Sequence, residues 1–472
     1  MDDPERPLRL DAPREEALEH AAKLVAEAWR SFDRPRPEEP PLDDRVRRLL
    51  EEGLPDRTVS VHEALDDAAR ALDESIAQPR PRYFAFIGSS GLEIGALGDL
   101  LAATYDMNLA VDARAATLLE QQAVRWVGEF VGFPAANGAF TSGGTISNMT
   151  ALAAARERAL PGSRAAGLGG LRVAVYASAE VHYSITRAVE ILGIGSDRLR
   201  DVPIDEHHRM RADLLAEAID RDVADGVTPI AVVATAGTTL TGAIDPLADI
   251  AGVCESRGIW LHVDGAYGLP AAAAHPDRFA GVERADSVSV DAHKWLYVPK
   301  ACSVVLVREA GALSRAFAHE EGYLPHQRHE LHAVDITLEY SRPLRALKLW
   351  LAMRAHGADQ FRDAIRRNLA EAELLYRSAM ARADFETFPV PPDLSIVPIR
   401  HTPDGVEDLD AHNDALAKAI QADGRVYLAS ALIEDRVWLR PCFVNYRTTD
   451  EDVLAVLDVA ADLGERIART RR

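Results

Sequence analysis

The sequence predicts an α/β protein with a mostly parallel sheet, a helical arm before the sheet and a smaller α+β domain after it. Residues 1–80 are acidic and helical in pattern, whereas residues 81–310 alternate short apolar runs with helical stretches. From about residue 340 onward, helices and strands come in blocks. Since 472 residues exceed one ordinary core, we expect three regions, at 1–80, 81–340 and 341–472.

The first 80 residues carry two helix signals and a proline-rich break. A helical pattern over about 13–31 ends before the proline-rich stretch 35–41. A second helix begins at Ser60, because Ser60 and Glu63 have the spacing of a capping box. An arm this small cannot bury a core of its own, so we expect it to lie against the rest of the chain or a second subunit.

Five apolar runs in the central region lack polar alternation. Strands of this kind are buried on both faces, as in a parallel sheet that helices cover. The runs are V-A-V-Y-A-S (173–178), I-A-V-V-A-T-A-G (230–237), W-L-H-V-D-G-A (260–266), S-V-S-V-D-A (287–292) and C-S-V-V-L-V (302–307). They predict the core of the large domain.

The last region begins with a long helical pattern that runs from about 340 to Arg382. Strand-like segments follow near 394–400, 426–433 and 436–443, and a final helix starts at about 449. Such blocks indicate a separate α+β domain.

Charge and cysteine content restrict the partners and the compartment. With 53 Lys and Arg against 74 Asp and Glu, the formal net charge is −21, which disfavours nucleic acid and membrane surfaces as partners. Cys254, Cys302 and Cys442 stand far apart, which indicates a reducing compartment. Because the sequence lacks a signal-peptide pattern and an apolar run of roughly 20 residues, we expect a cytoplasmic protein.

Lys294 stands in S-V-D-A-H-K-W, directly after an apolar run. A lysine in this setting loses hydration, which would lower its pKa and leave a nucleophilic amine. Such an amine can form an imine with a carbonyl cofactor. The alternative is a loop lysine that reaches solvent.

Asp264 ends the apolar run in L-H-V-D-G-A-Y-G. An ionised carboxylate there is costly unless it meets a cation, and a protonated pyridine nitrogen is such a cation. Ala266 is small and shares the strand face of Asp264, so a flat ring could lie against the sheet. The alternative is that Asp264 caps the next turn.

Two glycines precede a helical pattern in T-S-G-G-T-I-S-N-M-T-A-L (141–152). Glycines let the backbone approach a phosphate, and a helix N-terminus offers free N–H groups and positive potential. Thr145 adds a hydroxyl donor, and Thr239 in A-G-T-T-L-T-G offers another. A structural turn before an ordinary helix is the alternative.

The order of these motifs along the chain is that of fold-type I pyridoxal-phosphate enzymes. From about Pro79 onward the chain resembles the group II pyridoxal-phosphate-dependent amino acid decarboxylases, the family of the aromatic amino acid and glutamate decarboxylases. The motifs most specific to this family are D-A-H-K-W (291–295) and H-V-D-G-A-Y (262–267). The resemblance implies pyridoxal 5'-phosphate as cofactor, decarboxylation of an L-amino acid, and a homodimer.

The resemblance also implies a role for each site residue. Lys294 holds the cofactor aldehyde, Asp264 pairs with the pyridine nitrogen, and His182 in S-A-E-V-H-Y-S stacks on the ring. Arg440, in V-W-L-R-P-C-F, resembles the arginine that takes the substrate α-carboxylate, although a surface strand arginine is the alternative. The remaining implied cofactor contacts are Gly144, Thr145, Thr239 and His293.

Tyr323, in G-Y-L-P-H, matches a tyrosine that the family carries on a mobile loop and that is thought to protonate the substrate carbon after carbon dioxide has left. A phenol holds its proton at neutral pH but can give it to a strong carbon base. Family members with phenylalanine there resemble enzymes that form aldehydes, so the tyrosine favours simple decarboxylation. The alternative is an ordinary loop aromatic.

Four histidines lie around that tyrosine, at positions His319, His326, His329 and His332. Histidines three residues apart on a helix could bind a metal, but no carboxylate-rich apolar cage accompanies them. We therefore expect no metal site.

Residues 110–120 depart from the family, because they lack the tryptophan and the Ser-Pro word of the aromatic enzymes. Tyr83, Phe84 and Phe86 favour an aromatic substrate side chain, unless they pack in the core. Asp112 and Arg114 could meet a charged substrate instead, so an acidic one stays open.

Three other functions remain open on the same fold. One is an oxygen-dependent aldehyde synthase, and another is an aminotransferase or lyase. A regulatory homologue without cofactor is the third, although it would be expected to lose Lys294 or Asp264, and both are present.

Overall fold

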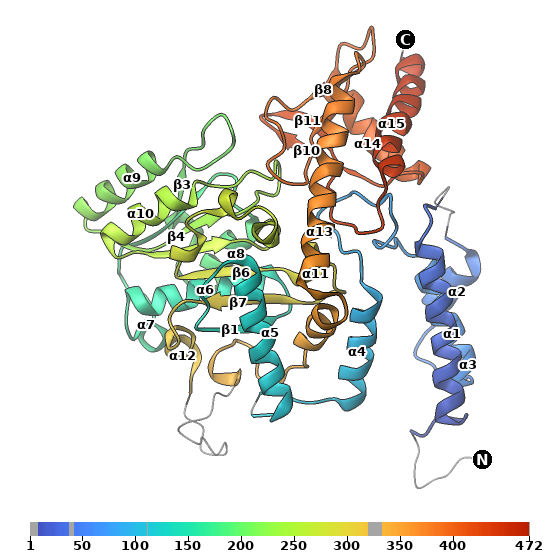
Figure 1. Ribbon diagram of the computed structural model, residues 1–472, viewed down its shortest axis with the longest axis horizontal. Coiled ribbons are helices and arrows are strands. Elements are labelled where there is room, and N and C mark those ends of the chain that lie inside the picture. Colours follow the sequence, from blue (N-terminus) through green and yellow to red (C-terminus); the bar gives the residue numbers. More distant parts are fainter. Residues whose placement is uncertain (1–7, 37–41, 111, 320–332, 472) are drawn as a thin grey trace.

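The computed structural model describes residues 8–36, 42–110, 112–319 and 333–471. Its centre is a seven-stranded sheet with the strand order β1-β7-β6-β5-β4-β2-β3, covered by helices on both faces (Figure 1). Only β7 runs antiparallel to its two neighbours, and the other neighbouring pairs are parallel. The predicted α/β class with a mostly parallel sheet is confirmed.

The strands of this sheet match the predicted apolar runs, except at the two edges. All residues of β2, β5, β6 and β7 are buried, as expected for strands covered on both faces. The edge strands β1 and β3 had no predicted counterpart. The bounds are β1 (Asn137–Thr141), β2 (Val173–Ser178), β3 (Leu199–Val202), β4 (Thr228–Thr235), β5 (Trp260–Asp264), β6 (Ser287–Val290) and β7 (Ser303–Val307).

Helices connect and flank these strands. The α-helices are α4 (Glu93–Tyr105), α5 (Ala115–Val131), α6 (Gly144–Ala159), α7 (Ser163–Ala166), α8 (Tyr183–Ile191), α9 (Ala212–Ala224), α10 (Leu247–Arg257), α11 (Ala292–Trp295) and α12 (Ala312–Phe317). Short 3-10 helices cover Ser196–Arg198, Leu269–Ala273, Pro276–Phe279, Val282–Arg284 and Ala333–Asp335. Helix α6 contacts β4, β5, β6 and β7, so its first turn lies near the carboxyl ends of the central strands.

A second, antiparallel sheet with the order β10-β11-β9-β8 forms the C-terminal part, as the predicted α+β pattern indicated. Helix α13 runs from the large sheet to this part and is kinked at Gly357, whose φ of 73° suits glycine (Figure 1). The domain bounds 81–340 and 341–472 stay predictions. The elements are α13 (Ala346–Met380), β8 (Phe385–Thr387), β9 (Ile399–His401), α14 (Leu409–Asp423), β10 (Ala429–Ile433), β11 (Arg436–Arg440) and α15 (Asp450–Arg471).

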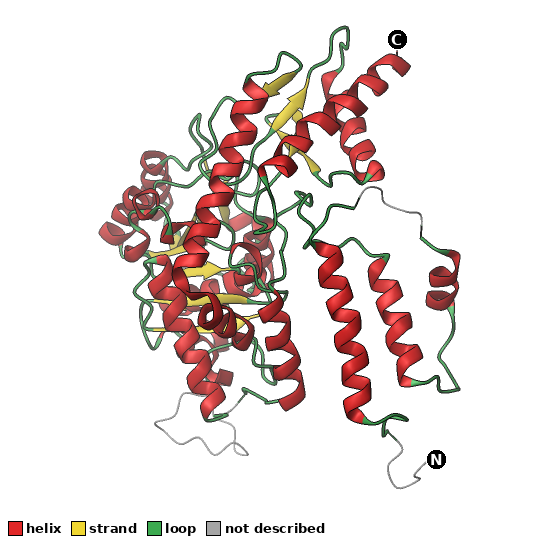
Figure 2. Ribbon diagram, turned by 45° about the vertical axis from the view of Figure 1, so that its right-hand side comes forward, coloured by secondary structure: helices red, strands yellow, loops and turns green. Residues whose placement is uncertain are grey.

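The N-terminal arm consists of α1 (Arg14–Phe32), α2 (Asp44–Glu51) and α3 (Val61–Asp73), and it stands beside the body of the chain (Figure 2). The Ser60 hydroxyl accepts a hydrogen bond from the Glu63 N–H at 3.2 Å, so the predicted N-cap is present. Helix α2 had no predicted counterpart. No helix within the described ranges is long and apolar enough to cross a membrane.

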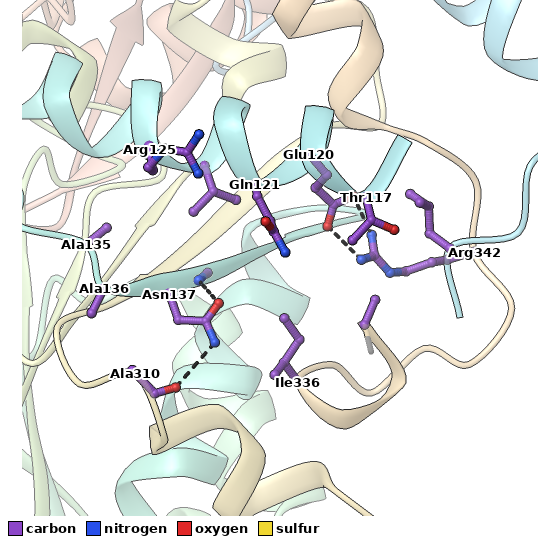
Figure 3. Close-up of a pocket in the computed structure, with 14 residues that line it drawn as sticks. Thr117, Glu120, Gln121, Arg125, Ala135, Ala136, Asn137, Ala310, Ile336 and Arg342 are labelled. Carbon is purple, nitrogen blue, oxygen red and sulfur yellow. Dashed lines mark hydrogen bonds and ion pairs between the residues drawn. The ribbon is translucent and has the colours of Figure 1, made fainter. Parts of the chain in front are cut away.

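A buried ion pair joins α5 to the segment that leads into α13. Glu120 and Arg342 form two hydrogen bonds, of 2.6 and 2.8 Å, and their side chains are only 7% and 2% exposed (Figure 3). The pair lies beside a cavity of about 400 Å³ between α5, β1 and residues 333–342, which contains no predicted site residue. The pair therefore fixes the segment 333–342 against helix α5.

We expect Arg342→Met to destabilise the protein strongly, because Glu120 would keep a buried charge without its partner. Loss of one partner of a buried pair costs about 3–5 kcal/mol of unfolding free energy. Urea denaturation would measure the change, and the matched control is Arg366→Met, which breaks the exposed pair with Asp363. The control should shift stability by less than about 1 kcal/mol. Equal stability of Arg342→Met and wild type would contradict the assigned role of the pair.

Candidate active site

One cavity of about 540 Å³ opens at the carboxyl ends of β4, β5 and β6, the edge where open α/β sheets bind ligands. Eight of the nine predicted site residues line it, and Tyr323 lies outside the described residues. The eight are Gly144, Thr145, His182, Thr239, Asp264, His293, Lys294 and Arg440. Residues that are up to 296 positions apart in the sequence (144 to 440) thus meet in one place.

Asp264 is buried at the end of β5 and accepts three hydrogen bonds. Asn148 Nδ2 donates to Oδ2 at 2.8 Å, while the Ser289 hydroxyl and the Ala266 N–H donate to Oδ1 at 3.2 and 3.1 Å. Donors from three segments stabilise an ionised carboxylate. The alternative, that Asp264 only caps the next turn, explains the Ala266 bond but not the bonds from Asn148 and Ser289. The three bonds together fix the direction of the carboxylate at the edge of the cavity.

Lys294 follows β6 on the short helix α11, and its Nζ lies 2.9 Å from Oδ2 of Asp291. Burial lowers the pKa of Lys294, but the Asp291 carboxylate outweighs burial and holds the pKa above the ordinary lysine value. The expectation of a lowered pKa is therefore wrong for this arrangement. The raised pKa is caused by the carboxylate of Asp291, three residues before Lys294, which the apolar run did not reveal.

Two histidines face the same cavity. His182 is the N-cap of α8, where its Nδ1 accepts from the Ser184 N–H at 3.3 Å and lies 2.9 Å from the Ser184 hydroxyl. Burial lowers the pKa of His182, against the opposing effect of Asp264. His293 contacts the Cys302 carbonyl through Nδ1 at 2.8 Å, and burial lowers its pKa too. Both rings are therefore neutral at pH 7.

Gly144 and Thr145 open α6, where the first N–H groups of a helix have no intrahelical partner. A Cβ at Gly144 would lie 3.0 Å from Asp291 Oδ2 and 3.1 Å from the Ala266 Cβ. A side chain here would press on both neighbours, so glycine suits the close approach of α6 to the strand ends. The free N–H groups and the positive helix end can then face an anion in the cavity.

Arg440 is the last residue of β11 and is buried, so the alternative of a surface arginine is wrong. Its Nε and Nη1 donate to the carbonyls of Leu240 and Phe86 at 3.3 and 3.4 Å, while Nη2 has no hydrogen-bond partner within the described chain. A buried guanidinium without a carboxylate partner suits an anionic ligand. Thr239 lies at the same cavity, next to Leu240.

Of the three predicted substrate aromatics, only Phe86 lines the cavity, together with Ile87 and Tyr183. Tyr83 stacks on Tyr427 at 5.2 Å, and Phe84 packs on Phe443 at 5.0 Å. Those two rings belong to the core of the C-terminal part, whereas Phe86 is 58% exposed. Asp112 and Arg114 do not line this cavity of their own chain.

Asp291 and Asn148 are among the polar residues of the site that sequence reasoning missed. Asp291 has the same signal as Asp264, a carboxylate directly after a buried strand. Asn148 is a polar residue that interrupts the apolar face of Ile146, Met149 and Leu152. Both would have been found by asking which polar residues stand at positions predicted to be buried.

The lining residues fit pyridoxal 5'-phosphate. A lysine amine can bind its aldehyde, the oriented Asp264 can pair with a pyridinium nitrogen, and the free N-terminus of α6 can take a phosphate. For a metal, within the described ranges, no group of three or more His, Cys, Asp or Glu side chains could hold one. His326, His329 and His332 lie outside those ranges.

Comparison with known proteins gives the same assignment. Residues 43–398 match the model of the pyridoxal-dependent decarboxylase conserved domain. The chain is 31% identical to an aromatic-L-amino-acid decarboxylase from Bacillus atrophaeus, over 90% of both chains. It is 33% identical to an L-2,4-diaminobutyrate decarboxylase from Rhizobium meliloti, over 75% of this chain and 71% of that protein.

A solved structure agrees along the whole chain. The crystal structure of Oryza sativa TDC with PLP and tryptamine has a TM-score of 0.90 and 25% identity, and the match covers 98% of this chain and 99% of the other. The fold, the cavity and these relatives together show that the chain belongs to the pyridoxal-dependent decarboxylase family, as a carboxy-lyase that acts on an amino acid with pyridoxal 5'-phosphate.

Proposed function

We propose that this decarboxylase converts an L-amino acid with an aromatic side chain into the amine and carbon dioxide. The observation that carries the proposal is the single cavity in which Lys294, Asp264 and a buried, carboxylate-free Arg440 meet. Phe86, Ile87 and Tyr183 at the same cavity supply apolar surface for the side chain. The aromatic substrate named for the Bacillus atrophaeus relative supports this choice.

The residues that would hold the cofactor divide by chemistry. Lys294 takes the aldehyde, Asp264 the ring nitrogen, and His182 one face of the ring. The phosphate would lie at the start of α6, and the other polar groups of the cofactor would be surrounded by Gly144, Thr145, Thr239 and His293. When bound, the cofactor acts as an electron sink that accepts the electron pair of the bond to the departing carboxylate.

The chain's own residues orient the substrate and manage its protons. Arg440 binds the α-carboxylate through the unpaired Nη2, which places that group beside the electron sink. Asp264 keeps its negative charge because three donors stabilise it, and so it holds the proton on the ring nitrogen. Tyr323 gives its phenolic proton to the α-carbon after carbon dioxide has left, an assignment that rests on the G-Y-L-P-H word.

Asp264→Asn should lower kcat by several powers of ten, because an amide of similar size cannot hold the proton on the ring nitrogen. Each tenfold loss corresponds to roughly 1.4 kcal/mol of barrier. The measurement is the initial rate of carbon dioxide release from the cofactor-loaded enzyme. Asp286→Asn is the matched control. Asp286 directly precedes β6, accepts a hydrogen bond from the Leu261 N–H at the amino end of the central strands, and does not line the cavity. Full activity of Asp264→Asn would reduce the aspartate to a structural cap.

Tyr323→Phe should still release carbon dioxide but form less amine, because bond cleavage needs the electron sink and not the phenol. The substrate that has lost carbon dioxide but gained no proton at the α-carbon could then give two electrons to oxygen, and water would complete the reaction to aldehyde, ammonia and hydrogen peroxide, which would be measured together with the amine. Tyr427→Phe serves as the control, because Tyr427 stacks on Tyr83 in the C-terminal part and does not line the cavity. Amine formation at the wild-type rate would assign the proton to another acid. Peroxide formed by the wild type in step with carbon dioxide would favour the aldehyde synthase.

We also propose that the enzyme is a homodimer whose N-terminal arm packs against the partner. Exposed apolar side chains gather on α1, on α4, and on and just after α3, and a cavity of about 560 Å³ lies between the arm and the loop at Pro299. Such surfaces mark protein interfaces. The residues are Leu18, Val25, Leu72, Ile76, Leu97, Leu100, Leu101 and Tyr105.

Light scattering should give twice the mass of the chain for the active protein. Leu100→Glu should shift the mass toward the monomer, because it places a charge in the proposed interface. Val223→Glu on α9 introduces the same charge at an exposed apolar position far from the arm and should leave the dimer intact. A wild-type enzyme that is active at the monomer mass would refute the dimer.

A further inference from the structure

Asn148 lies on α6 beneath the cavity, is 1% exposed and has every polar side-chain atom hydrogen-bonded. Nδ2 donates to Asp264 Oδ2 at 2.8 Å and to the Ser184 hydroxyl at 3.0 Å. Its Oδ1 lies 3.0 Å from Nε2 of His262. One amide thus connects the charged Asp264 with two histidine-bearing segments.

The direction of each hydrogen bond around Asn148 follows from donor and acceptor counts. An ionised Asp264 can only accept, so the amide must present its NH₂ group to the carboxylate and its oxygen to His262. Burial lowers the pKa of His262 to about 4, so this ring is neutral and carries one proton. Because Oδ1 can only accept, that proton sits on Nε2 of His262.

The far side of His262 agrees with this assignment. The indole N–H of Trp260 can only donate, and it donates to the Ser287 hydroxyl at 2.8 Å. The Ser287 proton is then free to reach Nδ1 of His262, 2.9 Å away. The unprotonated Nδ1 accepts it, so all bonds from Trp260 to Asn148 point the same way.

On the cavity side the chain of donors reaches His182. The Ser184 hydroxyl accepts from Asn148, which leaves its own proton available for Nδ1 of His182 at 2.9 Å. Independently, the Ser184 backbone N–H donates to the same nitrogen at 3.3 Å. With two donors on Nδ1, the single proton of the neutral His182 ring must sit on Nε2.

We propose that Asn148 is a positioning residue that sets the His182 tautomer with its proton on Nε2 while it holds Asp264 in its charged, oriented state. His182 then offers only a donor to the cavity, suited to a carboxylate or phenol oxygen, and cannot accept a proton there. The inference rests on the proposed roles of Asp264 and His182 at the bound cofactor. It makes one buried amide responsible for both groups.

The test reads the tautomer directly, by ¹⁵N NMR of the histidine-labelled holoenzyme at pH 7, with the His182 signals identified by their loss in His182→Gln. In the wild type we expect an unprotonated Nδ1 and a protonated Nε2. In Asn148→Asp the new carboxyl group would share one proton with Asp264 and accept the Ser184 proton, so the hydroxyl lone pair would face Nδ1 and the Nδ1–H form should increase. The kcat for carbon dioxide release should fall about ten- to a hundredfold, the effect of one lost hydrogen bond to a charged group.

Ser147→Ala is the matched control. Ser147 precedes Asn148 on α6, is equally buried and bonds to Thr141 and Ser303, but contacts neither Asp264 nor Ser184. It should keep the wild-type tautomer and change kcat by less than about tenfold. If Asn148→Asp does not fold, Ser184→Ala removes the hydroxyl donor at 2.9 Å, keeps the longer backbone donor at 3.3 Å and the bond between Asn148 and Asp264, and should lower the share of the Nε2–H tautomer.

Two results would overturn the proposal. The first is a wild-type His182 with its proton on Nδ1. The second is a folded Asn148→Asp, or in its place Ser184→Ala, with the same nitrogen signals and the same kcat as Ser147→Ala. The NMR result does not depend on turnover, so a protein that fails to decarboxylate would refute the proposed function and leave the tautomer assignment measurable.

Discussion

The site depends on one buried charge, the carboxylate of Asp264 at the end of β5. A charge in this position persists only if donors surround it, and its donors come from β6, from the turn after β5 and from α6. Because Asn148 stands one turn into α6, satisfying the charge also fixes where the first turn of that helix lies. The hydrogen bond between Asn148 and Asp264 therefore positions both the carboxylate proposed for the ring nitrogen and the positive N-terminus of α6 proposed for the phosphate.

The parts of the fold that the sequence predicted are those whose environment is uniform along the chain. Strand β2 coincides with its apolar run, because every residue in it is buried. Strand β3 was missed because it lies at the sheet edge, with the partly exposed polar pattern L-R-D-V. The short, exposed helix α2 likewise lacks an apolar face long enough to recognise.

The site was predictable residue by residue but not contact by contact. Lys294 and Asp264 follow apolar runs, so local sequence marks them, and Arg440 was placed by family resemblance. The burial of Tyr83 and Phe84 and the link from Asn148 to Ser184 depend on segments that meet only after folding, whereas Asp291 acts on Lys294 from three residues away but only once both are buried together. Electrostatics and hydrogen-bond direction are therefore properties of the tertiary structure.

Of the residues that we propose for the substrate side chain, Phe86 and Ile87 come from a different part of the chain than the residues proposed for chemistry, whereas Tyr183 adjoins His182. Phe86 and Ile87 belong to the connection between α3 and α4, whereas the donors around Asp264 belong to the sheet and α6. The ring of Phe86 takes no part in the donor series that runs from Trp260 to His182. A change confined to the Phe86 side chain keeps the carbonyl to which Arg440 donates, so it can alter the proposed fit of the substrate side chain while the reactive centre stays in place, a modular arrangement through which new substrate preferences can evolve.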